Sequence, residues 1–321
     1  MNIDPDLVQR FARDLDALIA PGARLGFAVS GGPDSLALLV LAAAARPGEV
    51  EAATVDHGLR PEGAAEADIV AGLCRRLDVP HATLNVRWRD PPTTAIQERA
   101  RRERYRLLGY WAEERGLAAI ATAHHADDQA ETLLMRLTRG AGVRGLAGMR
   151  PRSIAPGTDI RLLRPLLGWR RTELEQLCSA AGLEPVTDPT NGDQRFERVR
   201  VRSALAAADW LDGAAVARSA SHLADADLAL DWAMRREWQQ GVRESRGVIA
   251  YRHRDAPAEI QRRIVARALR KLASEGDADP RGAELDHLLD MLADGGSATL
   301  RGVLCRGGAE WRFTPAPERR S

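Results

Sequence analysis

The sequence predicts an α/β fold: a doubly wound, parallel five-stranded sheet with helices on both faces, followed by a smaller, mainly helical domain that ends in a β-hairpin. Three observations predict this. Short apolar runs alternate with helical stretches through most of the chain. A glycine-rich turn joins the first apolar run to the helix after it. The pattern then changes near residue 208, so we expect one domain over 1–208 and a second over 209–321.

The elements of the first domain follow from caps and periodicity. Asp4 and Pro5 are a helix cap and a first-turn proline, and apolar residues then recur at helical spacing until Pro21-Gly22. We expect strands at 25–29, 50–55, 81–86, 117–122 and 162–163, and helices at 36–45, 62–77, 94–115, 126–140 and 172–181. Strands that alternate with helices in this way require right-handed crossovers and therefore a parallel sheet.

The second domain has a different pattern. Helical periodicity predicts a long helix over 211–240 and shorter helices over 257–272 and 283–292. Polar and apolar residues alternate over 310–313, after the turn Arg306-Gly307-Gly308, which indicates a β-hairpin.

Composition restricts the class of protein. The net charge over 321 residues is only +1, and Lys271 is the single lysine, so any nucleic-acid site must be a local patch of arginines. Cys74, Cys178 and Cys305 are isolated and odd in number, which argues against a disulfide framework, a zinc site or an iron–sulfur site. The N-terminus lacks the pattern of a signal peptide, and no apolar block is long enough to span a bilayer. We expect a soluble cytoplasmic protein.

The segment Ser30-Gly31-Gly32-Pro33-Asp34-Ser35 is the first candidate site. A glycine turn between a buried strand and a helix presents free N–H groups to an anion, most naturally a phosphate. No lysine follows the glycines, so the pattern is not a Walker motif. Asp34 would repel a phosphate unless a cation lay between them, which favours a nucleotide pyrophosphate bound with a divalent metal. A simple glycine turn that caps a core helix remains the alternative.

A second candidate lies in the segment from Thr122 to Thr132, which carries two histidines and three carboxylates. Asp128 and Glu131 share a helix face, and Asp127 and Asp128 lie at the favourable N-terminal end of the helix. The alternative, that these acids only cap the helix, suffices for Asp127. Because ligands bind beyond the carboxyl ends of parallel strands, 30–35, 56–57 and 124–128 could meet in one crevice. Two adjacent histidines rarely point the same way, so we expect a loosely held Mg²⁺ rather than a dedicated metal nest.

Two arginine-rich segments, 97–105 and 195–202, are candidate RNA contacts. Such segments are usually solvated helix faces, which is the alternative for each. The arginines at 195, 198, 200 and 202 cannot all lie on one helix face, so we expect at least one to turn inward.

The ordered set of motifs resembles a known family. Ser30–Ser35 is similar to the SGGxDS loop of the PP-loop ATP pyrophosphatases. Within them, the chain over about residues 23 to 205 resembles the tRNA(Ile)-lysidine synthetase family. The segments that carry this resemblance are 56–60, 122–132, 139–142 with 145–149, 164–167 and 188–202. Val199 departs from the family pattern, which has asparagine there.

The resemblance implies a cytosolic ligase that uses ATP and Mg²⁺ to join free L-lysine to the cytidine at the first anticodon position of tRNA(Ile) with a CAU anticodon. It implies that Asp34 holds Mg²⁺ or shapes the activated intermediate. Asp128 and Glu131 would contact the cytosine amine or the lysine ammonium. Arg104 would neutralise phosphate charge, and Arg202 matches a family arginine. The ATP-binding residues would be Ser30, Gly31, Gly32, Pro33, Asp34, Ser35 and His57. The sequence leaves a monomer and a homodimer open.

Three other functions are weighed against this one. A PP-loop thiolase that makes 2-thiocytidine normally needs cysteines near the site, and the three cysteines lack that spacing. A non-catalytic tRNA-binding module would not need Ser30, Asp34, Asp128 and Glu131 together. A GMP-synthetase-like amidotransferase would need a glutaminase nucleophile, for which no segment is apparent.

Overall fold

The computed structural model describes residues 3–59, 62–90, 93–186, 194–253, 255–273, 280 and 282–317. Arg60 and residues 188–193 of the motifs above lie outside these ranges. The chain divides into two compact units, one of residues 1–138 and 148–220, the other of residues 139–147 and 221–321. The boundary expected near residue 208 precedes the division that follows Ala220.

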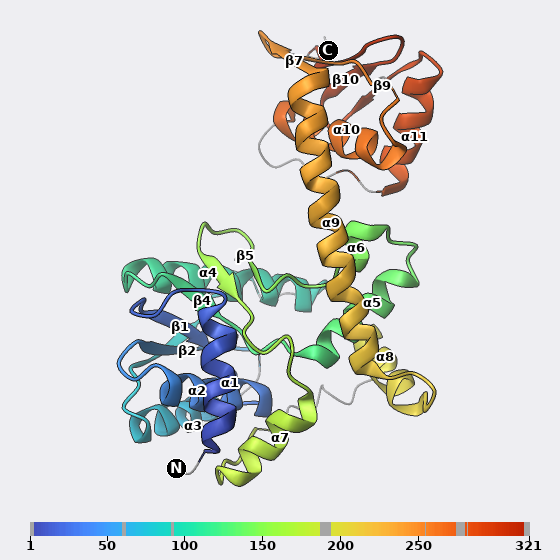
Figure 1. Cartoon of the computed structure of the whole chain (residues 1–321). Coiled ribbons are helices and arrows are strands. Elements are labelled where there is room, and N and C mark those ends of the chain that lie inside the picture. The colour runs from blue at the N-terminus through green and yellow to red at the C-terminus, as the bar shows by residue number, and fades with distance from the viewer. Residues whose placement is uncertain are drawn as a thin grey trace. The chain divides into compact units, whose positions relative to one another are not determined.

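The first unit contains a six-stranded sheet in the order β3-β2-β1-β4-β6-β5 (Figure 1). Its strands are β1 (Leu25–Ala28), β2 (Val50–Asp56), β3 (His81–Asn85), β4 (Ala119–Ala121), β5 (Arg152–Ile154) and β6 (Arg161–Leu163). Every pairing is parallel except that of β5 with β6. The predicted parallel five-stranded sheet is confirmed. The antiparallel edge strand β5 is an addition, because three residues with one apolar side chain give no strand signal in the sequence.

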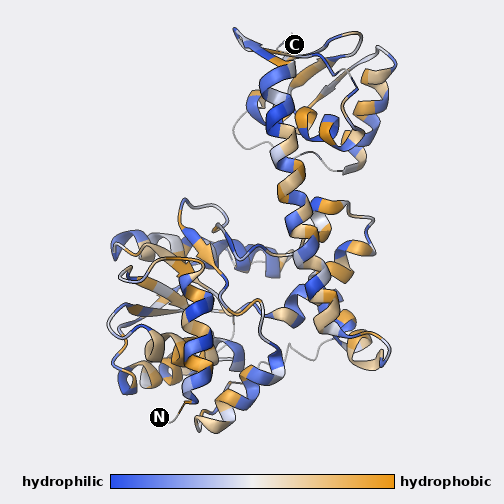
Figure 2. Cartoon of the chain, viewed as in Figure 1, coloured by the Kyte–Doolittle hydropathy of each residue, from blue (hydrophilic) through white to orange (hydrophobic). Residues whose placement is uncertain are grey.

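Helices cover both faces of this sheet, as predicted. The unit contains α1 (Pro5–Asp16), α2 (Pro33–Ala45), α3 (Gly63–Arg76), α4 (Ile96–Glu114), α5 (Ala126–Leu137), α7 (Arg171–Ala180) and α8 (Glu197–Ala207). Of these, α1, α2, α3 and α7 lie on one face and α4 on the other, whereas α8 packs with α5. Asp4 caps α1 by accepting a 2.9 Å hydrogen bond from the Asp6 N–H. The nearly uninterrupted apolar sequence of α2 buries this helix among α1, α3 and α7 on one side of the sheet. On the other side α4 buries Tyr105, Leu108 and Trp111, while its remaining surface is mainly hydrophilic (Figure 2).

The second unit packs helices against one face of an antiparallel sheet. Its strands are β7 (Val242–Ser245), β8 (Val248–Tyr251), β9 (Ser297–Leu300), β10 (Val303–Arg306) and β11 (Trp311–Pro315), in the order β7-β8-β11-β10-β9. The unit also holds α6 (Val143–Leu146), α10 (Ala258–Leu272), α11 (Gly282–Ala293) and the later part of α9 (Gly213–Gly241). The predicted terminal hairpin is β10 with β11. It belongs to a larger sheet whose other strands, of four residues each, are too short to predict.

The apolar residues of this second sheet face the helices. Tyr251, Trp311, Phe313 and Cys305 are fully buried against α10 and α11, which lie in front of the strands in Figure 1. Within the described residues, every helix is too short or too polar to cross a membrane.

Candidate active site at the carboxyl edge of the parallel sheet

The loop after β1 is shaped by its glycines and by Ser35. Gly31 has φ +86°, a conformation that side chains disfavour, and Gly32 is the N-cap of α2. The Ser35 hydroxyl accepts a 3.1 Å hydrogen bond from the Ser30 N–H and donates one of 2.9 Å to the Gly32 carbonyl. These bonds fix the turn at the start of α2, where the first N–H groups of a helix lack intrahelical partners and can bind an anion.

The buried imidazole of His125 connects this loop to α5. His125 is only 2% exposed. Its Nε2 lies 3.6 Å from Asp34 Oδ2 and 3.5 Å from Asp128 Oδ2, and its Nδ1 lies 3.5 Å from Asp127 Oδ2. Two of the predicted site residues, Asp34 and Asp128, are therefore held around one side chain. The sequence drew attention to the histidine pair but did not assign this central position to His125.

The two adjacent histidines have opposite charge states, as their opposite environments require. Burial lowers the pKa of His125, but the nearby carboxylates of Asp127, Asp34 and Asp128 outweigh it and raise the pKa to about 10. For His124, burial lowers the pKa to about 3; Asp128 opposes this, while Arg164 and Arg198 add to it. An imidazolium at 125 supplies part of the positive charge that Asp34 requires beside a phosphate.

We expect a His125→Asn variant to lose the alkaline pH dependence of stability. The unfolded pKa of a histidine is about 6.5, so the raised folded pKa contributes stability that is complete below that value and is lost as pH rises toward about 10. Urea unfolding of the wild type and the variant, at a series of pH values between about 6.5 and about 10, measures this pH-dependent stability. The free-energy difference between wild type and variant should shrink as pH rises. A constant difference would show that His125 is neutral in the folded protein.

Glu131 is the most buried carboxylate of the group and pairs with α8. It is 2% exposed and accepts hydrogen bonds of 2.6 Å from both Arg198 Nε and Arg202 Nε. Arg198 Nη2 also donates to Asp128 Oδ1 at 2.7 Å. Arg200 turns the other way, to the carbonyls of 194 and 195. The expectation that part of this segment points inward is confirmed. Arg198, which sequence reasoning did not include among the site residues, holds both carboxylates.

Asp127 has a separate structural task. Its Oδ2 accepts a 2.8 Å hydrogen bond from the Arg171 N–H, at the first residue of α7. Burial raises the pKa of Asp127, but the neighbouring His125 imidazolium and the Arg171 N–H hydrogen bond outweigh this and hold the pKa well below its usual range. A capping role was a sufficient explanation for Asp127 in the sequence. Asp127 does cap a helix, but the helix is α7 and not α5, to which Asp127 belongs.

Arg104 and His57 lie together beside the end of β2. Arg104 Nη2 is 3.4 Å from His57 Nε2, and the His57 carbonyl accepts a 2.7 Å hydrogen bond from Trp88 Nε1. Arg104 is exposed. Because β2 and β1 are parallel neighbours, this pair shares an edge of the sheet with Ser30–Ser35 (Figure 1).

The donor set fits a loosely held Mg²⁺. Asp34 Oδ1 is buried and has no hydrogen-bond partner within the described part of the chain. In the same described ranges, no group of three or more His, Cys, Asp or Glu residues could hold a metal ion. A single free carboxylate oxygen suits a Mg²⁺ whose other ligands are phosphates and water.

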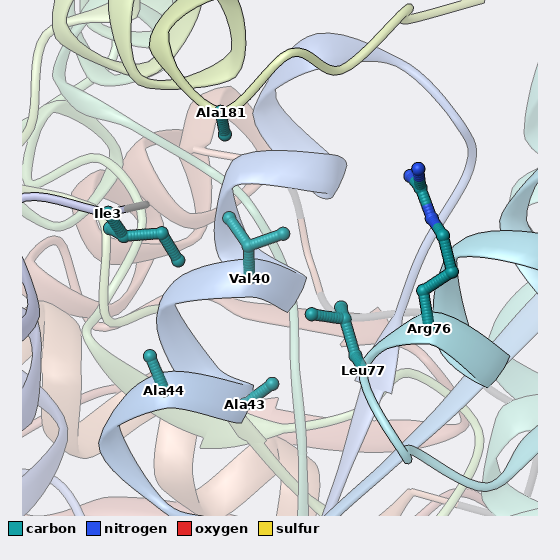
Figure 3. Close-up of a pocket in the computed structure, with 7 residues that line it drawn as sticks. All are labelled: Ile3, Val40, Ala43, Ala44, Arg76, Leu77 and Ala181. Carbon is teal, nitrogen blue, oxygen red and sulfur yellow. The ribbon is translucent and has the colours of Figure 1, made fainter. Parts of the chain in front are cut away.

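A surface pocket of about 420 Å³ lies elsewhere in this unit. It is lined by Val40, Ala43 and Ala44 of α2, by Arg76 at the end of α3 and by Leu77, which follows α3 (Figure 3). These residues are in the later half of α2, remote from its glycine-rich start. The lining has no carboxylate, histidine or other nucleophile, so it cannot supply the chemistry of the cluster around His125.

Comparison with known proteins assigns the family. The PP-loop domain family matches residues 7–208. A tRNA(Ile)-lysidine synthase of Novosphingobium aromaticivorans is 50% identical over 97% of this chain and 94% of its own length. The chain belongs to the tRNA(Ile)-lysidine synthase family. A second member, from Zymomonas mobilis, is 41% identical over 92% of this chain and 90% of its own length.

Membership of the tRNA(Ile)-lysidine synthase family makes this chain a ligase-type tRNA-modifying enzyme, and its PP-loop domain implies ATP binding. Among solved structures, the U34-tRNA thiolase NcsA of Methanococcus maripaludis has a TM-score of 0.57 and 16% identity over 70% of this chain and 80% of its own. At that identity the likeness concerns the fold alone, and it agrees with the predicted fold.

Proposed function

We propose that the chain joins the ε-amine of free L-lysine to C2 of the cytidine at the first anticodon position of an AUA-reading tRNA(Ile) with a CAU anticodon. ATP is consumed, and lysidine, AMP and pyrophosphate are the products. Family membership supports the class of reaction. The observation that supports the assignment of residues is the contact of His125 with both Asp34 of the loop and Asp128 of α5, because the loop before α2 then lies beside the carboxylates of α5.

In the first step the cytosine O2 attacks the α-phosphorus of ATP. A bond forms between O2 and phosphorus, and the bond to the bridging oxygen of the departing pyrophosphate breaks. The N–H groups of Gly31, Gly32 and Asp34 in the loop and the charge of Arg104 stabilise the phosphates. The free oxygen of Asp34 would hold Mg²⁺, which would supply further charge neutralisation.

In the second step the lysine ammonium loses a proton to solvent, and the resulting amine attacks C2 and forms the C2–N bond. The C2–O2 bond breaks, and AMP leaves with the former cytosine oxygen. We assign the incoming ammonium to Asp128, because the side chain of Asp128 is 13% exposed whereas that of Glu131 is 2% exposed and bonded to two arginines. Glu131, Arg198 and Arg202 then act as positioning residues. The cytosine must be unstacked to reach this edge of the sheet.

Incorporation of labelled lysine tests the proposal. Unmodified tRNA(Ile) with the CAU anticodon should accept lysine in a reaction that releases AMP only when ATP, lysine and this tRNA are all present. Methionine tRNA, which shares the anticodon, is the control and should not accept lysine. Equal AMP release with ammonia or a sulfur donor, and none with lysine, would refute the proposal.

The thiolase alternative is not favoured by the burial of the cysteines, although the Cys178 thiol donates a 3.2 Å hydrogen bond to the Pro33 carbonyl of the loop. Cys74 lies in α3, Cys178 in α7 and Cys305 in β10 of the other unit, and all three are free and buried. Burial raises the pKa of the Cys74 and Cys178 thiols to about 11, so neither is a ready thiolate.

A further inference from the structure

The outer face of the second sheet carries a row of arginines that the proposed reaction does not use. Strand register places Arg243 of β7 opposite Ala250 of β8, which is opposite Arg312 of β11, which in turn is opposite Arg306 of β10. Residues directly opposite each other in antiparallel strands point to the same face. At about 4.8 Å between strands, this arginine row (Arg243, Arg312 and Arg306) spans about 14 Å.

The arginine row faces solvent. The neighbours of these residues along each strand, such as Tyr251, Trp311 and Cys305, are buried against the helices, so the row must lie on the opposite face. The side chains of Arg243 and Arg312 are 66% and 64% exposed. Arg306 is exposed, and its side chain makes no hydrogen bond or ion pair with the residues that the structure describes. The positions around the row are hydroxylic or aliphatic: Ser245, Thr314, Ser297 and Thr299, together with Val248 and Leu304.

One carboxylate, Glu310, holds part of the row in place. Arg243 and Arg312 both pair with it, and Arg252 lies 3.5 Å from it. Four arginines against one glutamate give this surface a local positive charge, although the whole chain carries only +1. A surface of this sign attracts a polyanion.

We propose that the arginine row binds the phosphate backbone of a base-paired stem of the substrate RNA, an inference that rests on the proposed function. Guanidinium groups bind phosphate oxygens in a bidentate geometry. No aromatic side chain occupies the row, so the face offers no platform on which unpaired bases could stack. A broad, shallow face suits the wide, shallow minor groove of an A-form duplex and its flanking phosphates.

Variants of the whole protein test this proposal. Arg306→Gln/Arg312→Gln should weaken tRNA binding about tenfold and reduce the salt dependence of binding by about two counterions, with kcat at saturating tRNA unchanged. Glu310→Gln should act in the opposite direction and tighten binding, because it frees the two arginines. The matched control is Arg262→Gln/Arg270→Gln on α10, the helix that covers the inner face. The proposal would be overturned if the row and control variants lost tRNA affinity equally, or if Glu310→Gln did not raise tRNA affinity.

Competition in direct binding assays identifies the ligand independently of catalysis. An RNA duplex of unrelated sequence should compete with tRNA on the wild type and compete less well on the row variant. A single-stranded RNA of equal length that competes better than the duplex would contradict a duplex site. Competition by polyglutamate but not by the duplex would indicate that the arginine row binds an acidic partner protein. That result would also contradict a duplex site. The two proposals can fail separately. If the wild type does not incorporate lysine but the Arg306→Gln/Arg312→Gln variant still binds the duplex more weakly than the wild type, the proposed function is wrong and the arginine row remains an RNA-binding surface.

Discussion

The Glu131→Gln variant is expected to lose at least about two orders of magnitude in kcat/KM, which is the scale for a misplaced catalytic group. The substitution keeps the shape of the side chain but removes the charge that holds Arg198 and Arg202. It therefore releases α8 from α5 and disturbs Asp128, which shares Arg198. We also expect a loss of about 2 kcal/mol in the free energy of unfolding. This loss is smaller than that for breaking a fully buried ion pair, because Arg198 and Arg202 are half-exposed and water can solvate their freed guanidinium groups.

Glu51→Gln is the matched control for this experiment. Glu51 is likewise buried, at 5% exposure, and is bonded to two arginines, Arg24 and Arg115. It lies near the start of β2, at the amino-terminal edge of the same sheet. We expect a comparable loss of stability and unchanged kcat/KM. Parallel losses of activity in the two variants would show that Glu131 acts only through stability.

The Asp34→Asn variant is expected to lose at least about a hundredfold in kcat while its affinity for tRNA changes by less than about twofold. The amide cannot supply the negative oxygen that fits Mg²⁺, and it removes one of the three carboxylates around His125. Rapid-quench measurement of AMP formation and direct tRNA binding separate the two quantities. The Mg²⁺ concentration for half-maximal activity should also rise.

Asp14→Asn is the control for Asp34. Asp14, in α1, accepts a 2.8 Å hydrogen bond from Trp169 Nε1, and asparagine can keep that bond. Its activity and Mg²⁺ response should match those of the wild type. An Asp34→Asn enzyme that turns over at near wild-type rate, or that loses tRNA affinity in proportion to activity, would contradict the role given to Asp34.

The parallel sheet and its edge could be predicted because local signals specify them. Apolar runs, caps and the glycine turn each lie within a few residues, and parallel strands bring their carboxyl ends together by topology alone. The bonds from α8 could not be predicted in the same way. Arg198 reaches Glu131 across 67 residues of chain, and only tertiary packing decides which arginine of the segment faces inward. The four-residue spacing of Arg198 and Arg202 beside the three-residue spacing of Asp128 and Glu131 was the available signal.

The role of His125 escaped prediction for a related reason. The sequence shows a histidine pair, but its charge state depends on three carboxylates, and Asp34 is contributed by another element. The five-stranded sheet of the second unit was missed because its strands are short and three of them carry mixed polar and apolar residues. Once the register of that sheet is known, arginines that are scattered in the sequence fall into one row.

The central claim is that one site, formed by the loop, α5 and α8, activates the base of the tRNA and not the amino acid. Transfer of an isotopic label tests it most directly. The reaction is run with tRNA(Ile) whose first anticodon cytidine carries ¹⁸O at O2, and the released AMP is analysed by mass spectrometry. Attack of O2 on the α-phosphorus predicts that the label appears in the phosphate of AMP. Unlabelled AMP, with the label found instead in AMP when the lysine carboxylate is labelled, would contradict the account.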